Sequence, residues 1–213
     1  MNLKLINNLI ANENYIIKQY GYNEVIHNNQ ITSNKLYFIK KGVVTINQID
    51  KTGENKILLL LGPTEYFGLK SIMYSYIPDP IYSISKSNET IIYEFHKSVI
   101  NKYLNNEILL NEDIGNIILQ RMYLLEKRID VLIKPNIKNR LYGSLLDIEN
   151  RIQKKLSEDL YIDQNNYIFM NQSEWGCYCR GARENICKAA GKLAKKFTSL
   201  NKYYSKLKST SQN

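Results

Sequence analysis

The sequence has 213 residues, of which 44% are hydrophobic, so the chain is long enough to bury a substantial core in one or two domains. No stretch approaches the roughly 18 uninterrupted apolar residues that a membrane-spanning helix needs, and we expect no membrane partner. The first residues lack both the cleavage site of a secretory signal and the arginine and serine content of a transit peptide. We therefore expect the protein to act in the compartment where it is made.

The formal net charge of +9 is distributed unevenly along the chain. Residues 134–213 contain 15 Lys and Arg against 7 Asp and Glu, whereas residues 1–133 contain 14 against 13. A charge that served only solubility would be spread more evenly. We therefore expect the C-terminal part to bind a polyanion.

The three cysteines, Cys177, Cys179 and Cys187, are odd in number and lie close together in the sequence. This arrangement indicates a reducing compartment and excludes a disulfide framework. Both histidines, His27 and His96, lie far upstream, so the cysteines alone form an incomplete zinc site. We predict structural cysteines and no metal.

Residues 36–95 predict a small barrel or jelly roll of short strands at regular spacing. Two apolar-rich runs in 36–46 are interrupted by Gly42, where we expect a bend or bulge. The turn sequence "DKTG" (50–53) and the apolar run "NKILLLL" (55–61) predict a hairpin. A loop, a short helix and two further strands are expected at 62–68, 69–76, 81–85 and 90–95.

The apolar period changes between residues 106 and 133, where it predicts one helix of about 25 residues. The apolar positions, at steps of four and three, are Ile114, Ile118, Met122, Leu125, Ile129 and Leu132. A stripe this narrow is usually buried against another helix, either within the chain or in a second subunit. We expect the second subunit, and we expect Pro135 to end the helix.

The basic C-terminal part predicts a helix over 136–153 with Asn136 as its N-cap. The stretch 161–197 predicts a short β segment and then two helices that are separated by a turn at Arg180–Gly181. Two short helices with glycine at the turn are typical of a helix-turn-helix unit.

Three stretches in this order carry a resemblance to a known family: "LYFIKKGVVTI…DKTGENKILLLLGPTEYFGLKSIM", the long helix, and "QSEWGCYCRGARENICKAAGKL". They resemble the Crp/Fnr transcription regulators. The resemblance implies an α+β fold with an N-terminal cyclic-nucleotide-binding-like β-roll, a long dimerisation helix and a C-terminal winged helix-turn-helix domain. The corresponding boundaries are 1–105, 106–134 and 135–213.

The resemblance also implies a set of DNA-binding positions. These are Gln172, Ala182, Arg183, Glu184, Asn185, Lys188 and Lys192. Arg183 could donate two hydrogen bonds to guanine, and Glu184 could accept one from cytosine. The alternative is that these charges lie on a solvated surface helix that does not bind DNA. The inward positions would be Ile186, Ala190 and Leu193. Further phosphate contacts would come from Lys195, Lys196, Lys202 and Lys206.

Within the family, "YFG" (66–68) and residues 119–146 are most similar to the NtcA-type global nitrogen regulators of cyanobacteria and red-algal plastids. That resemblance implies 2-oxoglutarate as effector. The implied contacts are Phe67, Gly68, Leu69, Lys70, Arg121 and Glu126. The arginine that the β-roll would supply is replaced here by Pro80, and the cyclic-nucleotide signature is absent. For Arg121 and Glu126, ordinary surface charge is the alternative.

These observations predict a homodimeric, non-enzymatic transcription regulator that binds a palindromic site on double-stranded DNA and acts with RNA polymerase. A nitrogen-responsive activator is expected, in the plastid stroma of an alga or otherwise in a bacterial cytoplasm. The usage of Asn, Ile, Lys and Tyr indicates an AT-rich genome. The alternative is a β-roll sensor or interaction module that has lost DNA binding.

Overall fold

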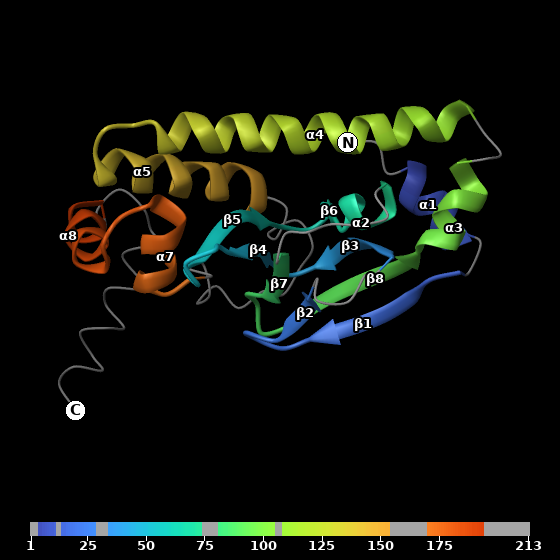
Figure 1. The fold of residues 1–213 in the computed structure, drawn as a ribbon, viewed down its shortest axis with the longest axis horizontal. Helices are drawn as coiled ribbons and strands as arrows, with labels where there is room; N and C mark the ends of the chain where they lie inside the picture. Colours follow the sequence, from blue (N-terminus) through green and yellow to red (C-terminus); the bar gives the residue numbers. More distant parts are fainter. Residues whose placement is uncertain are drawn as a thin grey trace.

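The computed structural model describes residues 4–11, 14–28, 34–73, 81–104, 108–153 and 170–193. Two four-stranded antiparallel sheets make up its N-terminal half (Figure 1). The first has the order β1 (Ile16–Tyr20), β8 (Thr90–His96), β3 (Lys35–Lys41) and β6 (Tyr66–Phe67). The second has the order β2 (Val25–Asn28), β7 (Ile81–Ser85), β4 (Val44–Ile49) and β5 (Asn55–Leu61). Apolar side chains from both sheets share one buried cluster, so the sheets form a roll.

Gly42 lies at the corner where the chain leaves one sheet and enters the other, between β3 and β4. Its φ is +93°, and a Cβ there would lie 2.5 Å from Oγ1 of Thr90 and 2.8 Å from the carbonyl oxygen of Glu89. A side chain at this position would therefore be strained and would also clash. The predicted bend at Gly42 is confirmed, and the two runs beside it belong to different sheets.

The predicted hairpin is confirmed as β4 and β5, which pair from Val44 opposite Leu61 to Ile49 opposite Asn55. The amide of Gly53 donates to the carbonyl of Asp50 at 3.0 Å and closes the turn. The strands expected at 81–85 and 90–95 are β7 and β8, and the expected short helix is α2 (Leu69–Met73). The elements β1, β2, α1 (Lys4–Ala11) and α3 (Lys97–Leu104) were not predicted.

The long helix α4 (Ile108–Leu132) has 25 residues and runs along one side of the molecule, from the roll to the C-terminal helices (Figure 1). Its predicted apolar stripe has two environments. Ile114 and Ile118 pack against the cluster of α1, β3 and α3 side chains. Met122, Leu125 and Ile129 are 51%, 41% and 58% exposed. The second half of the stripe thus presents an apolar surface.

The described C-terminal residues, 137–153 and 170–193, contain α5 (Ile137–Ile148), the π-helical turn Glu149–Gln153, α7 (Gln172–Cys179) and α8 (Arg183–Leu193). The predicted N-cap is confirmed, because Oδ1 of Asn136 accepts a hydrogen bond from the amide of Asn139 at 2.8 Å. The expected single helix over 136–153 is α-helical only to Ile148. The β segment expected before α7 lies outside the described residues.

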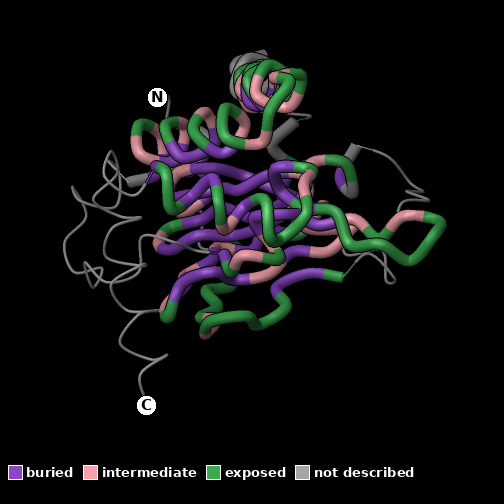
Figure 2. Tube along the Cα trace, turned by 90° about the vertical axis from the view of Figure 1, so that its left-hand side faces the viewer, coloured by how far each residue is buried: buried purple, intermediate pink, exposed green. Residues whose placement is uncertain are grey.

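One buried cluster connects the roll to these helices. Val43 and Leu60 of the roll belong to the same cluster as Ile152, Trp175 and Tyr178. Figure 2 shows the buried centre of the molecule in the sheets and exposed outer turns on the helices. The division at residues 105 and 134 stays a prediction. No helix in the described part of the chain combines the length and the hydropathy that crossing a bilayer requires.

Candidate nucleic-acid interface

The helix α7 begins with a complete capping box. Oδ1 of Asn171 accepts a hydrogen bond from the amide of Glu174 at 3.0 Å, and the Glu174 carboxylate accepts one from the amide of Asn171 at 2.8 Å. Because these bonds satisfy two amides that a helix start leaves unpaired, they determine where α7 begins. The helix ends at Cys179, and Arg180 adopts the left-handed conformation with a φ of 50°.

The turn between α7 and α8 requires a close approach of two backbones. The amide of Gly181 donates to the carbonyl of Gly176 at 3.0 Å. A Cβ on Gly176 would lie 2.7 Å from the carbonyl oxygen of Gly181, which is closer than real Cβ contacts. Glycine at position 176 therefore allows the tight turn of the two-helix unit.

The inner face of α8 is apolar. The predicted inward residues Ile186, Ala190 and Leu193 are confirmed as buried, together with Ala189. From α7, the side chains of Trp175 and Cys179 are buried in the same cluster. The helix is thus held on a scaffold by one face, and its other face is presented outward.

The outer face of α8 and the turn before it carry the predicted DNA-binding residues. Six of them are exposed: Ala182, Arg183, Glu184, Asn185, Lys188 and Lys192. Gln172, the seventh, is half-buried at the start of α7, and its Oε1 lies 3.4 Å from Nε of Arg183. This surface contains three cationic side chains and one carboxylate. The predicted phosphate contacts at 195, 196, 202 and 206 lie outside the described residues, as does any wing.

Two arginines that the sequence did not single out hold the C-terminal end of α7. A guanidinium nitrogen of Arg128 donates to the carbonyl of Tyr178, and the same guanidinium lies 3.5 Å from the centroid of the Tyr178 ring. Arg140 donates to the carbonyl of Arg180 at 3.2 Å and to that of Lys134 at 3.1 Å. Cations at a helix C-terminus stabilise it. Burial lowers the pKa of Arg128.

Two ion pairs join the helices to the roll. Lys86, in the turn between β7 and β8, pairs with the carboxylate of Glu174. Nη1 of Arg151 lies 2.8 Å from each carboxylate oxygen of Glu65 in the loop between β5 and β6. Because the side chains of Lys86 and Glu65 are 2% and 4% exposed, both pairs are shielded from water on the roll side. The helix-turn-helix unit is thus docked on the roll by charge as well as by apolar contacts.

The predicted effector residues are brought together only in part. The Phe67 ring is buried and stacks on Tyr37, with a centroid distance of 4.6 Å and an interplanar angle of 6°. Arg121 of α4 donates to the carbonyl of Tyr66, so it reaches the start of the predicted segment. Burial lowers the pKa of Arg121. Glu126 is exposed.

The other residues of the predicted segment follow Phe67 directly. Gly68 and Leu69 are half-buried, and Lys70 is exposed. Position 80, where the roll arginine was expected, lies outside the described residues.

The cysteines have separate environments. Cys177 is exposed, whereas Cys179 is buried beside the hydroxyl of Ser144. Burial raises the pKa of the Cys179 thiol to about 11. Cys187 is half-buried, and its thiol lies 2.7 Å from Oε1 of Gln172. The structural role predicted for Cys179 agrees with its burial.

The cyclic nucleotide-binding domain family matches residues 17–107. No curated protein matches the sequence. Among solved structures, FixK2 from Bradyrhizobium japonicum is similar, with a TM-score of 0.67 at 14% identity over 85% of this chain and 85% of that chain.

Two other solved structures illustrate the same likeness. A transcriptional regulator of the CRP family from Thermus thermophilus has a TM-score of 0.65 at 14% identity, over 84% of this chain and 85% of that one. The c-di-GMP-responsive global regulator CLP of Xanthomonas campestris has a TM-score of 0.63 at 13% identity, over 89% and 92% of the two chains. The predicted fold class is therefore confirmed. Residues 17–107 match the cyclic nucleotide-binding domain family, and the described part of the chain shares the fold of the solved regulators named above.

Proposed function

We propose that this protein is a transcription regulator of the Crp/Fnr type whose helix α8 enters the major groove of DNA. The observation that carries the proposal is the two-sided character of α8. Its inner face is buried against α5 and α7, and its outer face presents Arg183, Glu184, Lys188 and Lys192. The buried inner face fixes the position of the helix, and the outward charged residues of its first turn lie where a recognition helix contacts DNA.

The residues on this face suit different parts of a duplex. Arg183 can donate two hydrogen bonds to O6 and N7 of guanine, and Glu184 can accept one from the amino group of cytosine. Both lie in the first turn of α8, which is the part of a recognition helix that reaches base edges. Lys188 and Lys192 lie further along and are available to phosphates. Such contacts supply affinity without sequence information.

A homodimer would place two such helices on one palindromic site. The outer surface of α4 supports this part of the proposal, because Met122, Leu125 and Ile129 are 51%, 41% and 58% exposed there. An apolar stripe on a helix of this length is stabilised by packing against a second helix. A second copy of α4, related by a twofold axis, provides this second helix. The two α8 helices of the dimer would then read half-sites about one turn of DNA apart.

An effector would bind between the roll and α4. The contact between Arg121 and the Tyr66 carbonyl supports this place, because it couples the long helix to the segment of Phe67 and Gly68. A small dicarboxylate is the ligand that an arginine fork suits, and 2-oxoglutarate remains the specific candidate. Binding there would shift α4 relative to the roll and thereby change the population of DNA-competent dimers. Nitrogen-responsive activation, RNA polymerase contact and a plastid or bacterial setting stay predictions.

Fluorescence anisotropy with labelled duplexes from upstream regions of the source genome tests the function. We expect saturable binding that unrelated duplex competes for only weakly, with two chains per site. Titration calorimetry with 2-oxoglutarate and, separately, cyclic AMP tests the effector. Binding of a small molecule without any DNA binding would favour the alternative of a sensor module. A protein that binds neither the duplexes nor either small molecule would contradict the proposal as a whole.

A further inference from the structure

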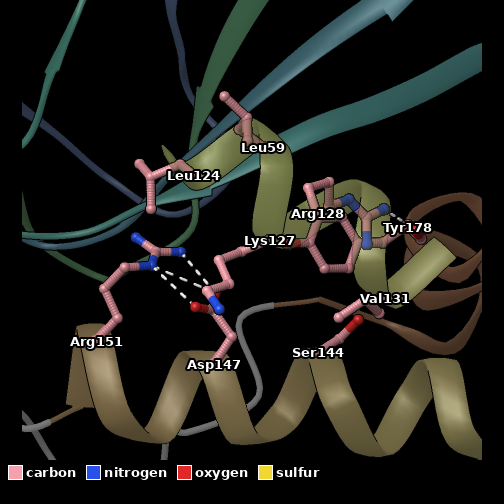
Figure 3. A pocket seen from close by; sticks show the side chains of 9 residues that line it. All are labelled: Leu59, Leu124, Lys127, Arg128, Val131, Ser144, Asp147, Arg151 and Tyr178. Atoms are coloured by element: carbon pink, nitrogen blue, oxygen red, sulfur yellow. Dashed lines mark hydrogen bonds and ion pairs between the residues drawn. The ribbon is translucent and has the colours of Figure 1, made fainter. Parts of the chain in front are cut away.

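A small cavity lies where α4 crosses α5 and β5, next to the end of α7 (Figure 3). Leu59, Leu124 and Val131 contribute apolar walls. Its polar lining consists of Lys127, Arg128, Ser144, Asp147, Arg151 and Tyr178. The space admits a water-sized group. None of the predicted effector or DNA-binding residues lines it, so the cavity belongs to neither of those sites.

The charges around this cavity are unbalanced. Arg151 binds the Asp147 carboxylate, with Nη2 and Oδ2 at 3.0 Å, and it also binds Glu65. The Asp147 carboxylate is therefore already engaged, as Figure 3 shows. Arg128 forms no ion pair with any carboxylate of the described residues. Lys127 adds a further positive charge and is exposed to solvent.

Arg128 also has an unused donor. One of its guanidinium nitrogens donates to the Tyr178 carbonyl, but Nη1 is buried and has no hydrogen-bond partner within the described part of the chain. The residue as a whole is only 9% exposed. An unpaired charged donor in the interior is costly, because it has lost its hydration without replacement. The arrangement therefore lacks one acceptor, and a negatively charged acceptor would also balance the charge.

We propose that this cavity binds an oxyanion, meaning a carboxylate or phosphate group of a small molecule. One oxygen enters the space and accepts a hydrogen bond from Nη1 of Arg128, while Lys127 attracts the remaining negative charge at the solvent side. The small volume limits the buried part of the ligand to a single oxygen. A water molecule could accept the same hydrogen bond but would add no negative charge to a lining that carries Lys127, Arg128 and Arg151 against the single carboxylate of Asp147.

Occupancy of this site would stabilise the junction between the long helix and the helix-turn-helix unit. Arg128 projects from α4 and holds the last turn of α7 through the Tyr178 carbonyl and ring. An anion on Nη1 would add a charge-assisted contact at the same guanidinium and would restrain it. The inference does not depend on DNA binding, because the residues that form the cavity differ from those on the outer face of α8.

Thermal unfolding of the full chain, with inorganic phosphate or acetate as the probe and chloride at equal ionic strength as the reference, tests this proposal. Binding to the folded state raises the unfolding midpoint with ligand concentration. Phosphate also stabilises proteins by exclusion from their surface, so variants are compared with the wild type in the same salts. We expect either probe to raise the wild-type midpoint above that in chloride. A larger rise in phosphate indicates a site for phosphate groups, and a larger rise in acetate indicates a site for carboxylates.

In Lys127→Gln we expect the apparent affinity to fall by about fivefold, as for loss of one partly exposed charge. In Arg128→Met we expect the part of the wild-type rise in unfolding midpoint that comes from anion binding to disappear. If the Arg128 variant does not fold, the Lys127 variant decides. Lys138→Gln, which removes an exposed lysine of α5 outside the cavity, is the matched control and should respond like the wild type.

Three results would overturn the proposal. The first is a wild-type midpoint that is no higher in either probe than in chloride, which indicates a water-filled cavity. The second is a rise in the unfolding midpoint that is as large in Arg128→Met as in the wild type and that has the wild-type apparent affinity in Lys127→Gln. The third is loss of the effect in Arg183→Ala instead, which would place the anion on the α8 surface.

Discussion

Arg151 binds both carboxylate oxygens of Glu65 at 2.8 Å and so joins the π-helical turn after α5 to the loop between β5 and β6. The same carboxylate accepts a hydrogen bond from the amide of Gly62 at 2.7 Å. The pair is mostly shielded from water, with side-chain exposures of 16% for Arg151 and 4% for Glu65. The ion pair therefore links the roll directly to the C-terminal helices.

Replacing Glu65 should test this coupling. In Glu65→Gln the Arg151 guanidinium loses a buried counter-charge, and we expect the free energy of unfolding to fall by about 3 kcal/mol. Urea denaturation measures the change. Glu54→Gln, at an exposed position of the β4–β5 turn, should cost no more than about 0.5 kcal/mol. Equal and small effects in the two variants would show that the ion pair contributes nothing to docking.

Arg183→Ala and Lys192→Ala should affect DNA binding differently. Loss of an arginine that reads a base should cost about 1–3 kcal/mol on the specific site and should relax selectivity there. Loss of a lysine at a phosphate should weaken binding to all sequences and lower the salt dependence. Anisotropy titrations at several salt concentrations separate these outcomes. Indistinguishable changes in the two variants would contradict the assignment of base reading to the first turn of α8.

The exposed stripe of α4 predicts a dimer that a single charge should disrupt. In Ile129→Glu we expect the dimer to dissociate, because two carboxylates would be buried against each other at the helix pair. The fold of each chain should persist, since Ile129 is 58% exposed in the single chain. Light scattering after gel filtration gives the mass, and circular dichroism checks the fold. A wild-type protein that is already monomeric at high concentration would exclude this interface.

The buried thiol of Cys179 predicts a specific loss of stability in alkali. Its pKa is about 11 in the folded protein and 9.0 when unperturbed, so the unfolded state releases its proton first. Stability should therefore be unaffected below pH 9 and should fall by about 3 kcal/mol between pH 9 and 11. Urea midpoints across this range should decline less steeply in Cys179→Ala than in the wild type. Cys177→Ala, at an exposed cysteine, should keep the wild-type slope.

Local patterns in the sequence predicted those elements whose formation depends on nearby residues. The turn at 50–53 and the N-cap at Asn136 have their hydrogen-bond partners within a few residues, and the apolar positions of α8 recur at helical spacing. The strand β1 was missed because Ile16 and Ile17 are both exposed, so an edge strand of this kind has no alternation of buried and exposed side chains. The long stripe of α4 was predicted as one surface, but the roll covers its first half.

The contacts that place the candidate sites could not be predicted in this way. Lys86 and Glu174 are 88 residues apart, and Arg151 and Glu65 are 86 apart. Such pairs form only when the helices pack on the roll, and the apolar periodicity of the sequence does not predict that packing. Nothing in the sequence distinguishes Arg128 from the other charges of the long helix, and only the structure shows that it is buried against Tyr178 with Nη1 lacking an acceptor among the described residues.

The central claim is that α8 reads duplex DNA from a dimer. Sedimentation of the purified protein with a footprinted duplex from its own genome tests the claim most directly, because it reports binding and stoichiometry together. We predict a complex of two chains with one duplex that Arg183→Ala weakens. A protein that sediments as a free monomer beside unbound duplex, even at low ionic strength, would contradict it.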